Sequence, residues 1–221
     1  GGPQVDEAMK IYGVESERID GLRVTDKKTL EIARMVLVGQ VGRDIVSAIN
    51  RHGGIAVGTT GEDGRLMLAH QKDPRLGFVG EVDEINASIL ESLYFESLVP
   101  VIAPIGVDVE GQSLNINADE AAAAIAIGLG AKKLIVMSNI PGLLKDVNNL
   151  DSVISEMTAI EARQLMDTDA ISEGMIPKIR ACVDAVEKGV ERSHIIDGRK
   201  SHSLLVELFS DAGIGTMFTS A

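Results

Sequence analysis

The chain has 221 residues and a formal net charge of −12 at pH 7, because 33 acidic side chains outnumber 21 basic ones. A surface this acidic repels phosphate backbones, which makes nucleic acid a poor partner. Hydrophobic residues reach 45% of the chain but aromatic residues only 3%, so we expect a globular protein with an aliphatic core.

Periodicity and turn residues predict alternating helices and strands. In chain order, the predicted elements are helices at 5–12 and 27–52, strands at 55–58, 65–70 and 77–82, a helix at 87–97, a strand at 99–105, an extended segment at 113–117, a helix from about 119, strands at 133–137 and 153–156, helices at 159–166 and 173–189, a strand at 194–196, a helix at 203–209 and a strand at 216–218. This alternation predicts an α/β fold, a three-layer αβα sandwich with a mainly parallel open sheet.

Some element boundaries carry a local signal. Thr25 or Asp26 can cap the long helix, and the residues from Thr158 onward have the spacing of a capping box. A turn at 61–64 between two strands predicts a hairpin, and residues 107–112 predict a second one. In the helix at 87–97, the side chains expected to face inward are Ile89, Leu90, Leu93 and Tyr94.

The compartment is constrained by the sparse cysteine content. Cys182 is the only cysteine, so it forms no internal disulfide and favours a reducing environment. The longest stretch of apolar and small residues, 121–131, is too short to span a bilayer, and no signal peptide is recognisable. We expect a cytoplasmic protein, or one of the plastid stroma in a photosynthetic eukaryote. A removed targeting segment stays open, because the sequence opens without Met.

Several common catalytic motifs are absent from the sequence. The four histidines, His52, His70, His194 and His202, lack metal-ligand spacing, so no metal site is predicted. The sequence has no Gly-x-Ser-x-Gly nucleophile motif, no Walker A loop and no Gly-x-Gly-x-x-Gly opening a helix after a strand. Any chemistry must therefore come from isolated polar residues at element junctions.

The most informative junction holds Asn115, Asn117 and Asp119, which stand two residues apart. In an extended segment this spacing directs all three side chains to one face. A helix begins at about Asp119, and helix N-termini attract anions. On local pattern alone, an Asx-rich turn that caps the helix explains the same residues.

Two cations stand at further junctions. Arg23 precedes a helix, where its guanidinium could bind a carboxylate with two hydrogen bonds; the alternative is an ordinary surface arginine. Lys178 follows Pro177, which suits the first turn of a helix. A lysine there opposes the helix dipole but could hold an anion; the alternative is a solvated helix lysine.

Taken together, these segments resemble the acetylglutamate kinases of the amino acid kinase superfamily. Each motif alone is modest, whereas their order and spacing are specific and cover the whole chain. The matching segments are 1–3, 21–26, 35–39, 77–82, 104–106, 115–119, 141–142, 174–178, 194–199 and 213–217.

The resemblance implies phosphorylation of the γ-carboxylate of N-acetyl-L-glutamate by Mg-ATP, in arginine biosynthesis. ATP and Mg²⁺ are the implied cofactors. It also implies a single amino acid kinase domain over 1–221, with a substrate-binding lobe at 1–112 and a nucleotide-binding lobe at 113–221. A homodimer or higher homo-oligomer is expected, and the helix at 27–52 could serve its interface or cover the sheet.

The resemblance also assigns roles to individual residues. Lys178 would neutralise charge in the transition state, and Asp119 would orient catalytic lysines, with Asn117 keeping its carboxylate pointed. The implied substrate-binding residues are Gly1, Gly2, Arg23, Asn115 and Asn117. The implied nucleotide-binding residues are Asn139, Ile140, Pro141, Gly142, Leu143, Leu144, Ala170, Ile171 and Ser172.

The sequence departs from the family pattern in three places. The family's first strand carries a Lys-x-Gly-Gly segment with a second catalytic lysine, and this sequence begins after that strand and helix. We therefore expect little or no kinase activity from these 221 residues alone, and rescue when the strand is restored. Asn139 stands where the family has Asp, and Glu62 stands where it often has Lys in the substrate lid.

The C-terminal region resembles the arginine-inhibited branch of the family. His202 and Glu207 are the candidate residues for an arginine effector, and a packed C-terminal helix and strand is the alternative. A non-catalytic paralogue that binds substrate or effector without turnover is the alternative to an active kinase. Glutamate 5-kinase, carbamate kinase and aspartokinase fit less well, because Arg23 and the 115–119 group match acetylglutamate kinase better.

Overall fold

The computed structural model describes residues 1–19, 21–146, 149, 152–168, 171, 174–210 and 213–220. The chain separates into two compact units, Gly1–Ala121 and Ala122–Ala221. The division after Ala121 falls within helix α5 (Ala118–Gly128), whereas the sequence predicted the lobe boundary at 112. The assignment of substrate to one lobe and nucleotide to the other stays a prediction.

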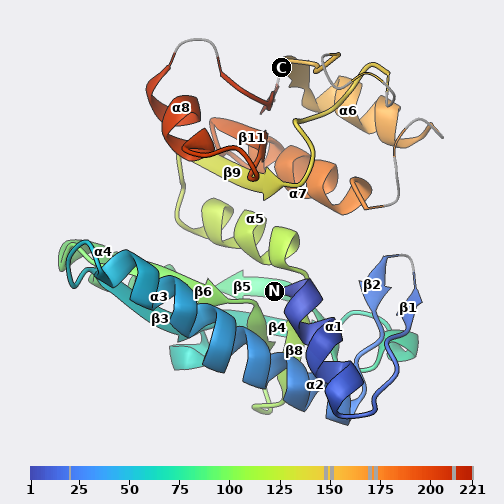
Figure 1. Cartoon of the computed structure of the whole chain (residues 1–221), viewed down its shortest axis with the longest axis vertical. Helices are drawn as coiled ribbons and strands as arrows, with labels where there is room; N and C mark the ends of the chain where they lie inside the picture. The colour runs from blue at the N-terminus through green and yellow to red at the C-terminus, as the bar shows by residue number, and fades with distance from the viewer. Residues whose placement is uncertain are drawn as a thin grey trace. The chain divides into compact units, whose positions relative to one another are not determined.

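The helices of the first unit form where the sequence pattern places them (Figure 1). Asp26 is the residue that caps the long helix, because its Oδ1 accepts a hydrogen bond of 2.7 Å from the Thr29 backbone N–H. The long helix is continuous from Lys27 to Asn50, but its middle segment is π-helical and contains Gly39 and Gly42. The helical elements are α1 (Gly2–Ile11), α2 (Lys27–Arg34), the π-helical η1 (Met35–Gly42), α3 (Arg43–Asn50) and α4 (Ala87–Phe95).

The strands of the first unit pair in three groups. β1 and β2 form a small antiparallel hairpin, β3 and β6 pair in parallel, and β4, β5, β8 and β7 close into a barrel. Closure satisfies the strand edges of the barrel internally. Their bounds are β1 (Arg18–Ile19), β2 (Leu22–Arg23), β3 (Ala56–Thr60), β4 (Met67–Gln71), β5 (Val79–Ile85), β6 (Val99–Ala103), β7 (Ile105–Val107) and β8 (Ser113–Ile116).

The predicted hairpin across 61–64 is wrong, although both strands and the turn exist. β3 pairs with β6 and β4 pairs with β5. The turn after β3 is fixed by Asp63. Its Oδ2 accepts hydrogen bonds from the Thr60 backbone N–H at 2.7 Å and from the Thr59 hydroxyl at 2.8 Å. Turn residues therefore marked the reversal correctly but did not choose the strand partner.

Two other local predictions have different outcomes. The hairpin across 107–112 is confirmed, because β7 and β8 pair antiparallel. The inward position of Tyr94 is wrong: its side chain is 78% exposed, while Leu90 on the same helix is buried. Only one stripe of this nine-residue helix packs against the unit, and Tyr94 lies outside it.

The second unit is a mixed sheet covered by helices. The strand order is β10–β12–β11–β9, with β12 antiparallel to β11 and the other two pairings parallel. The predicted capping box is confirmed, because Thr158 and Glu161 bond each other's backbone N–H groups. The elements are β9 (Lys133–Ser138), β10 (Glu156–Thr158), α6 (Ala159–Met166), α7 (Ile176–Glu187), β11 (Arg192–Asp197), α8 (Ser203–Phe209) and β12 (Thr216–Thr219).

The α/β class with parallel strand pairing is confirmed. Within the described residues the strands divide among separate sheets instead of forming one continuous open sheet. The second unit's core is aliphatic as expected, with Ile179, Val183 and Ile195 fully buried, and Cys182 is also buried within it. Across the part of the chain that the structure describes, every helix is too short or too polar to cross a membrane.

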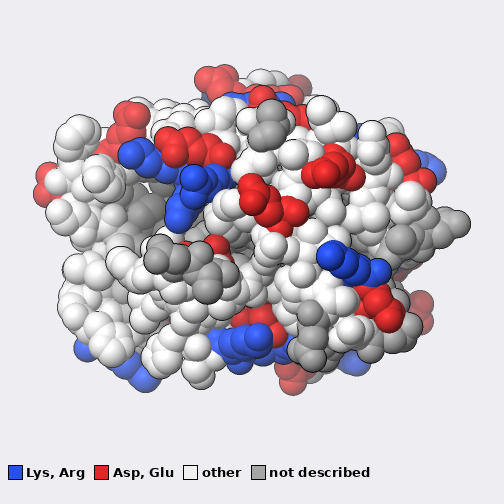
Figure 2. All heavy atoms as spheres, turned by 90° about the horizontal axis from the view of Figure 1, so that it is seen from above, with Lys and Arg blue, Asp and Glu red and all other residues white. Residues whose placement is uncertain are grey.

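Charged side chains are interspersed on the surface. On the face that Figure 2 shows, Lys and Arg lie in small separate groups among the Asp and Glu side chains. Ion pairs account for part of this pattern: Arg163 of α6 pairs with Asp184 and Glu187 of α7, and this pairing raises the pKa of the Arg163 guanidinium.

Candidate active site

A cavity of about 320 Å³ opens in the first unit, within the size range of small-molecule sites. It is bordered by the N-terminus of α1, by η1, and by β2 and β8. The structure brings together on its wall all five residues that the sequence singled out for substrate, namely Gly1, Gly2, Arg23, Asn115 and Asn117.

The segment that carries Arg23 is anchored by an isolated strand bridge. Thr25 pairs in parallel with Gly77: the Thr25 N–H donates to the Leu76 carbonyl at 2.9 Å, and the Phe78 N–H donates to the Thr25 carbonyl at 2.7 Å. Gly77 has φ of +68°, and a Cβ on it would lie 2.4 Å from the Thr25 carbonyl oxygen. Only glycine meets both conditions, so Gly77 permits the bridge.

Asn115 is linked to Arg23 through the same threonine. The Asn115 Nδ2 donates to the Thr25 hydroxyl at 3.1 Å, and that hydroxyl donates to the Arg23 carbonyl at 2.9 Å. Thr25 is fully buried. The sequence predicted a possible cap at this position and gave no signal that the hydroxyl would join the two site residues, since this depends on how β8 packs.

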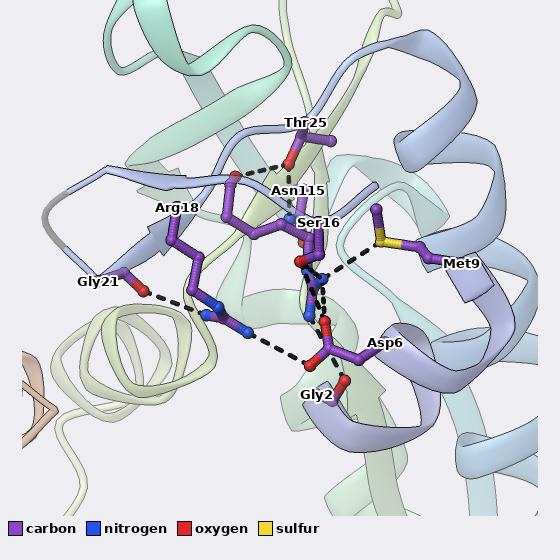
Figure 3. A network of polar contacts seen from close by, with 9 residues as sticks. Gly2, Asp6, Met9, Ser16, Arg18, Gly21, Thr25 and Asn115 are labelled. Atoms are coloured by element: carbon purple, nitrogen blue, oxygen red, sulfur yellow. Dashed lines mark hydrogen bonds and ion pairs between the residues drawn. The ribbon is translucent and has the colours of Figure 1, made fainter. Parts of the chain in front are cut away.

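The Arg23 guanidinium is held from α1 and from the loop that follows it (Figure 3). Its Nη1 donates to Asp6 Oδ1 at 2.5 Å and to the Ser16 hydroxyl at 2.7 Å, and lies 3.2 Å from the Met9 sulfur. The side chain is only 8% exposed, so the reading of Arg23 as an ordinary surface arginine is wrong. The Arg23 hydrogen bond holds the pKa of the Asp6 carboxyl below its usual range.

Asn117 is the residue that caps α5. Its Oδ1 accepts hydrogen bonds from the backbone N–H groups of Asp119 at 2.9 Å and Glu120 at 3.2 Å. Asp119 therefore lies in the first turn, as the sequence allowed. The two interpretations of Asn117, a helix cap and a residue of the candidate site, are therefore compatible: it caps α5 and also lines the cavity.

A second cavity, of about 370 Å³, lies in the second unit. Among the residues predicted for nucleotide, those lining it are Ile140, Gly142, Leu143, Leu144 and Ile171. Asn139 and Pro141 belong to the same loop but are not part of this wall, and Ala170 and Ser172 lie outside the described residues.

The loop that carries these residues is fixed to β12. The Leu143 backbone N–H donates to the Thr216 hydroxyl at 2.8 Å, and Gly142 has a φ of +154° directly beside that hydroxyl. The wall of the cavity is largely aliphatic, with Lys145 and Asp146 as charged members. A flat apolar group such as a nucleobase suits this composition.

Lys178 lies in the first turn of α7. The helix begins at Ile176, so Pro177 lies in its first turn as predicted, while the predicted start at 173 lies outside the described residues. The helix N-terminus and the ammonium group together make this end of α7 electropositive.

The two effector candidates have different environments. Glu207 is buried, accepts a 2.6 Å contact from His194 Nδ1, and accepts the Ile214 N–H at 2.9 Å. His202 is exposed and precedes α8 with φ of +60°. Burial lowers the pKa of His194 despite the neighbouring Glu207, which favours a neutral ring that donates from Nδ1. An effector role for either residue stays a prediction.

Glu62 is engaged with its own unit. It pairs with Arg34 of α2 at 3.0 Å and accepts the Ser113 hydroxyl at 2.5 Å. Because the expected hairpin does not form, the turn that contains Glu62 follows β3 without joining two paired strands.

Metal ligation by clustered side chains is not observed where the structure can be described: no three His, Cys, Asp or Glu residues gather suitably within those ranges. A divalent cation with mainly phosphate and water ligands would not need such a cluster.

Comparison with known sequences gives a consistent result. Residues 1–197 match the amino acid kinase family. An acetylglutamate kinase from Methanothrix thermoacetophila is 48% identical over 228 residues, covering 100% of this chain and 79% of that protein. An acetylglutamate kinase from Caldanaerobacter subterraneus is 48% identical over 219 residues, covering 98% of this chain and 73% of that protein.

Solved structures show the same fold. A Streptococcus mutans protein, smu.665, superposes with a TM-score of 0.84 at 30% identity, covering 100% of this chain and 84% of that one. An N-acetylglutamate synthase from Neisseria gonorrhoeae, complexed with coenzyme A and N-acetylglutamate, superposes with a TM-score of 0.85 at 24% identity, covering 98% of this chain and 50% of that one.

Proposed function

The chain belongs to the amino acid kinase family, and from this premise we propose that it is an acetylglutamate kinase, which phosphorylates the γ-carboxylate of N-acetyl-L-glutamate with ATP in arginine biosynthesis. One observation carries the proposal: five polar or glycine positions far apart in the sequence line a single cavity in the first unit. They offer a guanidinium, two amides and a helix N-terminus, which suits a small acylated dicarboxylate.

The chemistry needs no general base, because the attacking γ-carboxylate has no proton to lose. What it needs is the positioning of two anions and the neutralisation of their charge. Arg23 would bind the α-carboxylate, which is the carboxylate that does not react. Asn115 would bind another part of the substrate, and the backbone N–H groups at Gly1 and Gly2 would face the transferring phosphoryl group.

The nucleotide would bind in the second unit. The aliphatic wall formed by Ile140, Leu143 and Leu144 would contact the base, and Lys178 at the start of α7 would neutralise phosphate charge. Asp119 would orient catalytic lysines. Mg²⁺ would arrive with ATP, since this ion keeps water and phosphate ligands in most kinases.

The test is a hydroxamate assay that detects the acyl phosphate formed from N-acetylglutamate and ATP. Two proteins are compared, the 221-residue chain and a version carrying a Lys-x-Gly-Gly strand ahead of Gly1. We expect acyl phosphate mainly from the second. Binding of N-acetylglutamate without turnover in either protein would favour the alternative of a non-catalytic paralogue.

Lys178 provides a sharper test of the mechanism. In the active protein, Lys178→Ala should lower kcat by roughly a hundredfold, because charge neutralisation of this kind contributes about that factor, while N-acetylglutamate binding stays nearly unchanged. Lys188, which is exposed at the other end of α7, is the matched control, and Lys188→Ala should leave kcat unaltered. Equal kcat values for both variants would remove Lys178 from the mechanism.

A further inference from the structure

Asp6 and Ser16 contact the Arg23 guanidinium without belonging to the wall of the substrate cavity. Arg23 is part of that wall, whereas Asp6 and Ser16 line a different hollow, near the end of α1. The Ser16 hydroxyl also donates to Asp6 Oδ1 at 3.1 Å, so the carboxylate, the hydroxyl and Nη1 form a closed triangle (Figure 3). The triangle holds the guanidinium from behind.

The contacts are unevenly divided over the guanidinium. Nη1 contacts Asp6, Ser16 and the Met9 sulfur, whereas Nη2 makes one long hydrogen bond of 3.4 Å to the Gly2 carbonyl. Within the described ranges, Nε of Arg23 makes no hydrogen bond. The edge formed by Nε and Nη2 is the one that can donate two parallel hydrogen bonds to a carboxylate. A ligand can therefore bind this edge while Asp6 keeps its place.

A second cation depends on the same carboxylate. Arg18 lines the cavity, and its guanidinium donates to Asp6 Oδ2 at 3.5 Å and to the Gly21 carbonyl at 3.3 Å. Asp6 thus has one oxygen on each arginine. Without its charge, two guanidinium groups at the cavity would face each other with no counter-ion from α1, and like charges this close repel.

We propose that Asp6, supported by Ser16, is a positioning residue that fixes Arg23 with its Nε–Nη2 edge directed to the α-carboxylate of the acylated amino acid. The proposal rests on the proposed function for the identity of that ligand. It assigns no contact between Asp6 and substrate: the carboxylate acts through the guanidinium, by limiting its rotation and by separating it from Arg18.

The test compares two ligands in calorimetric titrations, which need no turnover. N-acetyl-L-glutamate carries the α-carboxylate, and N-acetyl-L-isoglutamine has an uncharged amide in its place. Asp6→Asn should weaken binding of the first about tenfold, as expected for loss of a charge-assisted contact, and leave the weak binding of the second unchanged. Glu7→Gln, an exposed neighbour on the same helix, is the control and should bind both ligands like the wild type.

Each outcome decides between the proposal and an alternative. An equal loss for both ligands would mean that Asp6 is merely structural, and unchanged or tighter binding of N-acetylglutamate would mean that Asp6 competes with substrate for Arg23. If the wild type binds neither ligand, the proposed function is wrong and this inference falls with it. Should Asp6→Asn not fold, Ser16→Ala at an exposed position must still weaken N-acetylglutamate binding selectively, by about threefold, or the proposal is wrong.

Discussion

Two charged side chains of this protein are nearly buried, and each has an oppositely charged partner in place of water. Arg23 is nearly buried but keeps a carboxylate beside it, and Asp197, at the end of β11, is a second example with the signs reversed. The Asp197 carboxylate is 3% exposed and accepts the Arg199 guanidinium on both oxygens at 2.9 Å, together with the Arg199 backbone N–H at 3.0 Å. Asp197 is thus stabilised as an anion.

This pairing predicts a pH dependence of stability. The Arg199 hydrogen bonds lower the pKa of Asp197 from 3.8 to about 2. Because the pKa is lower in the folded state, the stabilisation is complete above about pH 4 and is lost as the pH falls towards about 2. Asp197→Asn should therefore flatten the fall of Tm over this interval. Asp44→Asn, at an exposed acid of α3, is the control; a wild-type slope in Asp197→Asn would contradict the prediction.

At the scale of elements, the cavity depends on short pieces of backbone that are held by neighbours far along the chain. β2 has two residues, and its continuation is held in place by the bridge from Thr25 to Gly77. Backbone geometry at Gly77 thus helps to position the segment that carries Arg23, although Gly77 does not line the cavity. Such a position is sensitive to a single added methyl group.

We expect Gly77→Ala to lower the free energy of unfolding by more than Gly13→Ala does. Both glycines have positive φ, +68° and +66°, so both variants meet a backbone penalty, and Gly77 with its ψ of −125° also lies outside the left-handed helical region. Only at Gly77 would the new Cβ also meet backbone, since nothing lies within 4 Å of a Cβ on Gly13. Urea denaturation measures the difference, and equal losses would show that the bridge tolerates a side chain.

At the scale of the whole molecule, each of the two compact units contains its own cavity. The cavity lined by Arg23 lies wholly within Gly1–Ala121 and the other wholly within Ala122–Ala221. A ligand that binds one unit stabilises the folded state of that unit by mass action. Ligand-linked stability is therefore a way to assign each ligand to a unit.

N-acetylglutamate at a hundred times its Kd should stabilise the protein by about 2.7 kcal/mol, which corresponds to a rise in Tm of roughly 5–10 °C. If the units unfold in separate transitions, only one should move. Arg23→Gln should abolish the shift. Thermal unfolding monitored by a dye measures this, since the chain has no Trp. A shift of the same size in Arg23→Gln would exclude the arginine from the binding site.

The sequence predicted those features that depend on neighbours close in the chain. Most helices and strands, the cap at Asp26 and the capping box at Thr158 follow from residues within a few positions of each other, whereas the short β1 and β2 were not predicted and β10 lies at Glu156–Thr158 instead of 153–156. One wrong prediction, the hairpin across 61–64, concerned strand pairing, because β3 pairs with β6, some forty residues later in the chain. Turn residues reverse the chain, but pairing energy between distant strands decides which edges meet.

The same division holds for the candidate site. Gly1, Gly2, Arg23, Asn115 and Asn117 were predicted from the sequence through its resemblance to the acetylglutamate kinases, which rests on the order and spacing of short motifs. Only the tertiary structure placed Asp6 and Ser16 behind Arg23 and joined Asn115 to it through Thr25. In the sequence, Asp6 is an acid on an amphipathic helix and Thr25 is a threonine after a strand, and the residues next to them do not indicate such a role. Hydrogen bonds of this kind form between side chains that only packing brings within 3 Å, so their partners are decided by the fold.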